Sequence, residues 1–319
     1  MTDDITVFTG NAHPEFAQEM CDILGVELSP TKITRFSNDC LQVQLRANCR
    51  RKDVYVVQPL VPPVQENLIE LLLMLDAARG ASANHITAVI PHFSYARSDK
   101  KDAPRISIGA KLVADLLATA GATRVITMTL HSEQVHGFFP VPVDHLSAIR
   151  ELAAHYADKD LTNTVVVSPD FGYAKVASEF ARLLQLPVAA GSKRRMGDDT
   201  VVIDEIVGDV RGKKVIIIDD EVATAGSMIE LMDKLREYEV GAISIATTHG
   251  LFTGKAVERL NSQDDVLEIV STNTVPLTPE RTPSKLESRS VAPLFAQAVR
   301  RHNAGESISS LFSDDVTYG

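Results

Sequence analysis

The chain has 319 residues, a formal net charge of −10, and a composition that is 45% hydrophobic and 23% charged. A single hydrophobic core stops growing at roughly 250–300 residues, so this length predicts two domains. The acidic balance argues against nucleic acid and anionic membranes as partners, because both need a basic surface. No apolar run approaches the roughly 20 residues of a membrane span, and no signal-peptide core follows the acidic start. We therefore expect a cytoplasmic protein.

Short apolar runs rich in β-branched residues alternate with helix-like stretches along the chain. The first helix is predicted at Pro14–Leu24, since a proline begins it and Gly25 ends it. Further helices are predicted at 67–79 and 108–120, and strands at 53–58, 86–91, 125–130, 165–168, 214–218, 243–247 and 267–271. The strands are continuously apolar, which is typical of parallel sheets buried on both faces.

This alternation predicts an α/β protein with mainly parallel sheets flanked by helices. The least patterned stretch between strong elements is 141–163. We place the domain boundary there, giving an N-terminal domain at 1–147 and a C-terminal domain at 148–319. The two halves are similar in size, which is expected if one ancestral domain was duplicated.

The segment 215–227, VIIIDDEVATAGS, carries the most chemistry in the sequence. A buried strand ends in two carboxylates, and a loop of small residues leads into a helix beginning near Met228. Ligands bind beyond the carboxyl ends of strands in open α/β sheets, and such a loop leaves backbone N–H groups for a phosphate. The carboxylates would repel a phosphate unless they hold sugar hydroxyls or a metal. The loop is therefore interpreted as a sugar-phosphate site.

This loop resembles the phosphoribosyl-binding loop of phosphoribosyltransferases and of ribose-phosphate pyrophosphokinases. The resemblance implies that Asp219 and Asp220 hold ribose hydroxyls. It also implies that a 5-phosphate is bound by Thr224, Ala225, Gly226 and Ser227. The loop alone leaves open an enzyme that consumes phosphoribosyl pyrophosphate and one that makes it.

Further segments resemble the pyrophosphokinase family specifically. The segment 93–108, FSYARSDKKDAPRISI, is similar to its ATP-binding segment, and 128–139, MTLHSEQVHGFF, is similar to its metal-binding segment. The segments SPDFG at 168–172 and KRR at 193–195 resemble its pyrophosphate and catalytic loops. The resemblance assigns ATP to Arg97, Asp99, Lys100, Lys101 and Arg105, Mg²⁺ to His131 and Asp170, and catalysis to Lys193 and Arg195.

Both ends of the chain add to the resemblance. The segment RFSN at 35–38 is similar to the part that reaches a neighbouring subunit's adenine pocket, with Phe36 stacking and Asn38 hydrogen bonding. The segment GESISSLF at 305–312 is similar to the allosteric loop of the phosphate-activated class. The implied regulatory residues are Arg50, Ser307, Ser309, Ser310 and Phe312. The family implies two phosphoribosyltransferase-like domains, a homohexamer, and inorganic phosphate and ADP as effectors.

The reaction implied by the resemblance transfers pyrophosphate from ATP to the 1-hydroxyl of ribose 5-phosphate, giving phosphoribosyl pyrophosphate and AMP. Five positions depart from the family pattern: Cys40, Ser98, Thr129, Tyr173 and Ala223. Thr129 lies two residues before His131, on the same face of the strand predicted at 125–130, where the family has an aspartate. The departures leave two alternatives to an active synthetase, a non-catalytic associated paralogue and an enzyme with altered substrate preference.

Overall fold

The computed structural model describes residues 5–195 and 201–311, without the side chains at 193–195, 201, 202 and 310. The chain divides into two compact units, which are described separately. Unit 1 contains the chain up to Ser147, the short return Thr274–Pro276 and the segment that begins at Val291. Unit 2 contains Ala148–Asn273 and Leu277–Ser290.

Unit 1 is built on a sheet whose described strands follow the order β2-β1-β5-β6-β7-β8. All neighbouring pairs are parallel, so the carboxyl ends of the strands share one edge of the sheet. Three helices make the crossovers that parallel strands need. The elements are β1 (Ile5–Thr9), α1 (Pro14–Leu24), β2 (Leu28–Ser29), β5 (Asp53–Val57), α2 (Val64–Gly80), β6 (His85–Ile90), α3 (Gly109–Ala120), β7 (Arg124–Met128) and β8 (Val143–Leu146).

An antiparallel hairpin of β3 (Thr31–Arg35) and β4 (Leu41–Leu45) completes the strands described in unit 1, and β4 packs against α2. The sequence pattern does not predict this hairpin. Its residues alternate between half-buried and exposed positions rather than forming an apolar run. Short 3₁₀ turns occur at η1 (Ser94–Arg97), η2 (Glu133–Phe138) and η4 (Ser309–Leu311).

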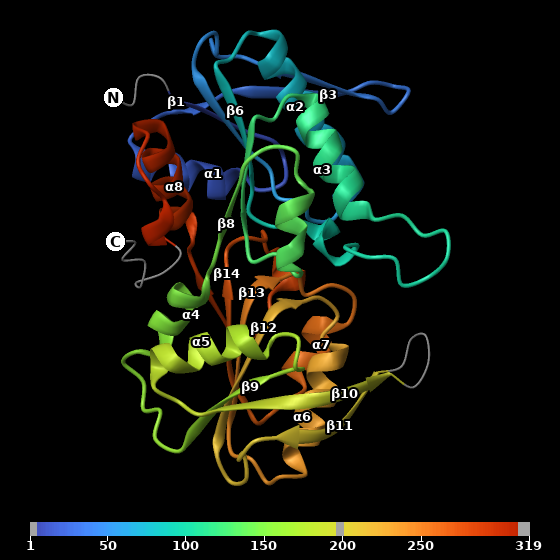
Figure 1. Cartoon of the computed structure of the whole chain (residues 1–319), viewed down its shortest axis with the longest axis vertical. Helices are drawn as coiled ribbons and strands as arrows, with labels where there is room; N and C mark the ends of the chain where they lie inside the picture. Colours follow the sequence, from blue (N-terminus) through green and yellow to red (C-terminus); the bar gives the residue numbers. More distant parts are fainter. Residues whose placement is uncertain (1–4, 196–200, 312–319) are drawn as a thin grey trace. The chain divides into compact units, whose positions relative to one another are not determined.

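The C-terminal helix α8 (Ala292–Ala304) belongs to unit 1, whereas the predicted boundary assigned all of 148–319 to the second domain. The helix packs against α1, where the Phe16 and Phe295 rings meet edge to face with centroids 5.4 Å apart. The hydroxyl of Tyr55 on β5 lies 3.0 Å from Nδ1 of His302. Figure 1 shows α8 in red beside α1 in blue. The buried apolar face of α8 therefore makes its contacts with the first unit.

Unit 2 is built on a sheet whose described strands follow the order β11-β10-β9-β12-β13-β14-β15. All pairs are parallel except β10 with β11. Figure 1 shows β10 and β11 as a long pair of strands at one side of this unit. The elements are α4 (Ile149–Tyr156), β9 (Thr164–Ser168), α5 (Ala174–Leu184), β10 (Val188–Arg195), β11 (Val201–Val207), β12 (Lys214–Val222), α6 (Gly226–Arg236), β13 (Ile243–Gly250), α7 (Ala256–Asn261), β14 (Val266–Thr272), η3 (Pro279–Arg281) and β15 (Leu286–Arg289).

The predicted α/β class with mainly parallel sheets is confirmed. Each predicted apolar run lies on a buried strand, and the helix predicted at Pro14–Leu24 has these bounds in the structure. Strand β12 continues to Val222, four residues beyond the predicted end at Ile218. Strand β7 ends at Met128, two residues before the predicted end at Leu130. Among the described residues, no helix is long and apolar enough to cross a membrane.

Candidate active site

A tight turn joins strand β12 to helix α6 in unit 2. Ala225 has a left-handed backbone conformation, with φ 58° and ψ 11°, and its side chain is buried. Its carbonyl oxygen accepts the N–H of Ile229, the first bond of the helix, while Thr224 and Ser227 are exposed. The first N–H groups of a helix have no partner within that helix, and they carry its positive dipole end. The turn can therefore bind an anion with backbone donors.

The turn is also braced from another element. Nη1 of Arg259, on α7, donates a hydrogen bond of 2.8 Å to the carbonyl oxygen of Thr224. A Cβ atom added at Gly226 would lie 3.5 Å from the same Nη1. No sequence pattern singles out Arg259, which lies 35 residues from Thr224 and outside every segment that carries the resemblance.

The acidic residues before the turn lie on a strand. Because side chains alternate across a strand, Asp219 and Glu221 share one face of β12 and Asp220 lies on the other. Asp220 is buried, whereas Asp219 and Glu221 are half-buried. The Oδ1 atom of Asp219 accepts the N–H of Asp220 at 2.9 Å. Glu221 thus joins the predicted pair as a third carboxylate before the turn.

The loop after β9 holds Asp170 in a defined position. Oδ1 of Asp170 accepts the N–H of Tyr173 at 3.1 Å, and its carbonyl oxygen accepts the hydroxyl of Ser168 at 2.7 Å. Tyr173 has φ −97°, a value that any residue adopts, so the departure at this position costs no backbone strain. A Cβ atom at Gly191, on the neighbouring strand β10, would meet the carbonyl oxygen of Pro169 at 2.7 Å.

Strand order gathers three predicted segments of unit 2 at one edge of its sheet. Strand β9 lies between β10 and β12 and is parallel to both, with Ser168 level with Ala190 and Val167 level with Ile217. Beyond these paired positions, toward the carboxyl ends of the strands, lie the SPDFG loop, the KRR run and the turn after β12. The backbone of Lys193 and Arg195 lies on β10, while their side chains lie outside the described part of the structure.

In unit 1, the predicted ATP segment forms a loop from η1 to α3. Arg97, Lys100, Lys101 and Arg105 are exposed, and Asp99 is half-buried. Ser98 closes the base of this loop. Its Oγ accepts the N–H of Gly109 at 2.9 Å and donates to the carbonyl of Ser107 at 3.4 Å, and its carbonyl accepts the N–H of Ala110 at 3.1 Å. The departure at Ser98 therefore has a structural role within the loop.

The predicted metal segment follows β7, beside β6. His131 is exposed, and Thr129 lies beyond the end of the strand with φ 41°. The expectation that Thr129 and His131 share a strand face is therefore wrong, because β7 ends at Met128 and the chain turns at residue 129. A positive φ is unfavourable for a β-branched residue, and aspartate tolerates it better.

Strand β8 fixes the backbone of this segment. The N–H of Thr129 donates to the carbonyl of Leu146 at 2.9 Å, and the N–H of Leu130 donates to Nε2 of His145 at 2.8 Å. Burial lowers the pKa of His145 to about 4. Its imidazole is therefore neutral near pH 7 and can accept the Leu130 N–H.

Phe36 and Asn38 lie at the tip of the β3–β4 hairpin. The Phe36 side chain is 48% exposed, which is unusual for a large aromatic residue. Oδ1 of Asn38 accepts the N–H of Cys40, and Asp39 has φ 72°. Arg35 forms ion pairs with Asp39 and Glu66, so the tip is held close to α2 while the aromatic ring stays exposed.

Arg50 and the predicted regulatory serines also belong to unit 1. Arg50 is exposed and lines a pocket of about 360 Å³ together with residues of β4 and α2. The hydroxyl of Ser307 donates to Oγ of Ser309 at 3.0 Å, and the Ser307 carbonyl accepts Nη1 of Arg301 at 2.9 Å. The side chain of Ser310 and the whole of Phe312 lie outside the described residues.

Two family profiles match the chain. One, described as the N-terminal domain of ribose phosphate pyrophosphokinase, matches residues 5–121. The other, described as a phosphoribosyl synthetase-associated domain, matches residues 200–313. Together the two matches take in the ATP segment and the turn after β12.

Individual proteins match over nearly their whole length. A Streptomyces coelicolor protein, named provisionally as a ribose-phosphate pyrophosphokinase, is 61% identical over 309 residues, covering 97% of this chain and 98% of that protein. The ribose-phosphate pyrophosphokinase of Deinococcus radiodurans is 48% identical over 315 residues, with coverage of 97% and 98%. The crystal structure of phosphoribosylpyrophosphate synthetase from Mycobacterium smegmatis superposes with a TM-score of 0.89 at 36% identity, covering 95% of this chain and 100% of that chain.

Proposed function

Since the chain belongs to the ribose-phosphate pyrophosphokinase family, we propose that it transfers the pyrophosphoryl group of ATP to ribose 5-phosphate. The anomeric hydroxyl oxygen forms a bond to the β-phosphorus, and the bond from this phosphorus to the α-bridging oxygen breaks. The products are phosphoribosyl pyrophosphate and AMP, with one proton released from the attacking hydroxyl. The observation that carries the proposal is the family match over both units, which includes the predicted binding segments of each.

The turn after β12 is the ribose 5-phosphate subsite in this proposal. The left-handed Ala225 and the start of α6 offer backbone donors, and Thr224 and Ser227 are exposed and carry hydroxyls. Gly226, the first residue of α6, has no side chain that would cover its backbone N–H group. Asp219 and Asp220 take the ribose hydroxyls. Alternation along β12 gives the two carboxylates different surroundings, so their removal should have unequal effects.

The loop at 97–105 is the ATP subsite. Its four cations, Arg97, Lys100, Lys101 and Arg105, are exposed, and their charge suits a triphosphate. Phosphoryl transfer depends mainly on positioning and charge neutralisation, with little covalent help from the protein. Lys193 and Arg195 on β10 stabilise the charge that develops on the transferred group.

Mg²⁺ is the proposed metal. It keeps several waters and takes few protein ligands beside the substrate phosphates. The exposed imidazole of His131 in unit 1 and the carboxylate of Asp170 in unit 2 are the proposed protein donors, and their small number suits this ion. When bound, the ion neutralises charge on the ATP oxygens. The protein's own part is to orient these two side chains on fixed loop backbones.

Assembly and regulation extend the proposal. The exposed Phe36 at the hairpin tip suits stacking on the adenine held by a neighbouring subunit, in a homohexamer of this chain. Arg50, with the pocket that it lines, and the serine-rich turn at 307–310 are assigned to inorganic phosphate and ADP as effectors. The reaction takes place in the cytoplasm.

The direct test incubates the purified chain with Mg²⁺, ATP and ribose 5-phosphate and follows products by phosphorus NMR. AMP and phosphoribosyl pyrophosphate should appear in equal amounts, and both should require ribose 5-phosphate. ADP as the product would assign a simple kinase, and AMP formed without the sugar would assign a hydrolase. Absence of turnover at every Mg²⁺ concentration would favour a non-catalytic paralogue.

A further inference from the structure

The loop proposed to bind the 5-phosphate has no cation of its own. The sequence contains no lysine or arginine between Lys214 and Lys234, while Asp219, Asp220 and Glu221 stand immediately before the turn. A phosphate dianion placed at the turn would therefore follow directly after acidic residues on both faces of β12. The helix dipole is equivalent to about half a positive elementary charge at the N-terminus. This charge is small compared with the combined negative charge of the three acidic residues.

Arg259 brings a full positive charge to this turn from α7. Arg259 as a whole residue is half-buried, and Nη1 of its guanidinium donates an exposed hydrogen bond of 2.8 Å to the Thr224 carbonyl. In a trans peptide the C=O and the following N–H point in opposite directions. A guanidinium that holds the Thr224 oxygen on one side therefore directs the Ala225 N–H to the other side. It also polarises the peptide so that this N–H is a stronger donor.

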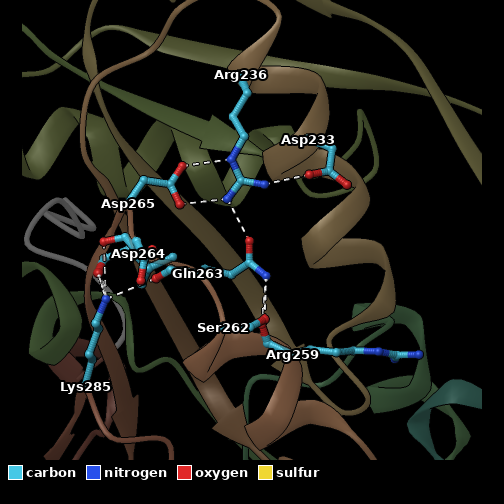
Figure 2. Close-up of polar contacts among 9 residues, drawn as sticks. Asp233, Arg236, Arg259, Ser262, Gln263, Asp264, Asp265 and Lys285 are labelled. Atoms are coloured by element: carbon cyan, nitrogen blue, oxygen red, sulfur yellow. Dashed lines mark hydrogen bonds and ion pairs between the residues drawn. The ribbon is translucent and has the colours of Figure 1, made fainter.

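The position of Arg259 is fixed by a second set of contacts at the end of α7. Nε2 of Gln263 donates to the Arg259 carbonyl at 2.9 Å, and Oε1 of Gln263 accepts Nη2 of Arg236 at 2.8 Å. Arg236 binds both oxygens of Asp265, at 2.7 and 2.8 Å. Figure 2 shows these residues as one cluster, from which the Arg259 side chain extends outward.

Charged hydrogen bonds hold the residues of this cluster together. Hydrogen bonding to Arg236 lowers the pKa of Asp265, and hydrogen bonding to Asp265 raises the pKa of Arg236. Lys285 donates to the carbonyls of Gln263 and Val266, at 3.0 and 2.6 Å, and so holds the chain that follows α7. Arg236 is also the last residue of α6, the helix that begins at the turn. The two ends of α6 are thus linked through Arg236, Gln263 and Arg259.

We propose that Arg259 is a positioning residue of the sugar-phosphate subsite. It holds the Thr224–Ala225 peptide in its left-handed turn, so that the Ala225 N–H faces the 5-phosphate, and it brings a positive charge to the turn. The inference rests on the function proposed above, because it takes the turn after β12 as the ribose 5-phosphate subsite. It adds a residue from a separate helix to the recognition of the phosphate.

Arg259→Ala is the main test, with Arg259→Lys and Gln263→Ala as graded variants. Loss of a charged hydrogen bond should raise the KM for ribose 5-phosphate about tenfold or more. The KM for ATP and the thermal unfolding temperature should stay near their wild-type values. Arg259→Lys retains the charge but loses the planar fork, so we expect an intermediate KM. Gln263→Ala should shift the KM in the same direction by less.

Arg211→Ala is the matched control, because Arg211 is an exposed arginine of unit 2 that pairs with Glu239. Calorimetric binding of ribose 5-phosphate without ATP gives a readout independent of turnover. If Arg259→Ala binds ribose 5-phosphate as tightly as the wild type does, or loses equal affinity for ribose 5-phosphate and ATP, the inference is overturned. The proposed function would still stand in that case if the wild type were active. A wild type that neither binds the sugar nor turns over would overturn the function itself. Should Arg259→Ala not fold, Arg259→Lys against Arg211→Lys decides the same question.

Discussion

The loop at 98–109 in unit 1 and the turn at 223–227 in unit 2 both follow a buried parallel strand, yet they are held in different ways. The first is long, its cations are exposed, and the hydrogen bonds of Ser98 fasten its base. The second is short, begins a helix directly, and is braced by Arg259 at the Thr224 carbonyl.

Under the proposed function, this contrast predicts two modes of phosphate recognition in one chain. A turn whose backbone is already fixed loses little conformational entropy when it binds, so its donors are ready for a small sugar phosphate. A long charged loop pays that entropy on binding and can close over a larger ligand, excluding water from the reaction. We therefore expect substitutions in the turn to affect ribose 5-phosphate and substitutions in the loop to affect ATP.

The largest effect is expected outside both binding loops. The proposal assigns substrate binding to the two loops and transition-state stabilisation to residues of β10. Lys193→Ala should therefore lower kcat by about 10²–10³-fold, because it removes one preorganised positive charge. The Michaelis constants should change much less. Steady-state kinetics measure this, with the adjacent Arg194→Ala as the control. An unchanged kcat with weaker ATP binding would make Lys193 a ground-state contact.

The rigidity of the turn is tested at Ala225. A β-branched residue is strained by roughly 1–3 kcal/mol at positive φ, so Ala225→Val should disturb the turn and raise the KM for ribose 5-phosphate about tenfold. Ala225→Gly, which tolerates the left-handed conformation, should keep a KM close to that of the wild type. Kinetics with both substrates measure the split. Equal KM values in the two variants would show that the turn is not preorganised.

Ser98 gives the corresponding test in the long loop. Ser98→Ala removes the hydroxyl that joins the loop base to Gly109, and a neutral hydrogen bond contributes about 1 kcal/mol. The KM for ATP should rise about fivefold, kcat should change little, and the KM for ribose 5-phosphate should stay constant. Ser98→Thr keeps the hydroxyl and serves as the control. A rise in the sugar KM alone would break the assignment of this loop to ATP.

The smallest effect is expected at Thr129. Aspartate would bring a carboxylate to the metal segment and would accept the positive φ more readily than threonine. Thr129→Asp should therefore lower the Mg²⁺ concentration for half-maximal activity a few-fold and leave kcat nearly constant. Thr129→Asn separates the two causes, because it relieves the backbone without adding charge. An identical Mg²⁺ requirement in all three proteins would mean that residue 129 does not shape the metal site.

Much of this organisation could be predicted from local sequence. The apolar run ending at Ile218 and the small residues after the acidic pair predicted a strand, a turn and a helix, and all three are present. Continuous apolar runs predicted the parallel sheets because such strands are buried on both faces.

Features that depend on distant contacts could not be predicted in this way. Arg259 belongs to a six-residue helix without a recognisable pattern, and its bond to Thr224 exists only in the folded unit. The role of Ser98 depends on the loop closing back to Gly109. The placement of α8 in unit 1 depends on a contact between the two ends of the sequence, at Phe16 and Phe295.

The central claim is that the loop at 98–109 binds ATP while the turn at 223–227 binds ribose 5-phosphate. Limited trypsin digestion, with cleavage positions identified by mass spectrometry, tests this claim most directly. Trypsin should cut the free protein after the exposed Lys100, Lys101 and Arg105. Mg²⁺ with ATP should slow these cleavages by about tenfold or more, because the loop closes on the triphosphate. Ribose 5-phosphate alone should leave them unchanged. Protection by the sugar phosphate alone, with none from ATP, would contradict the account.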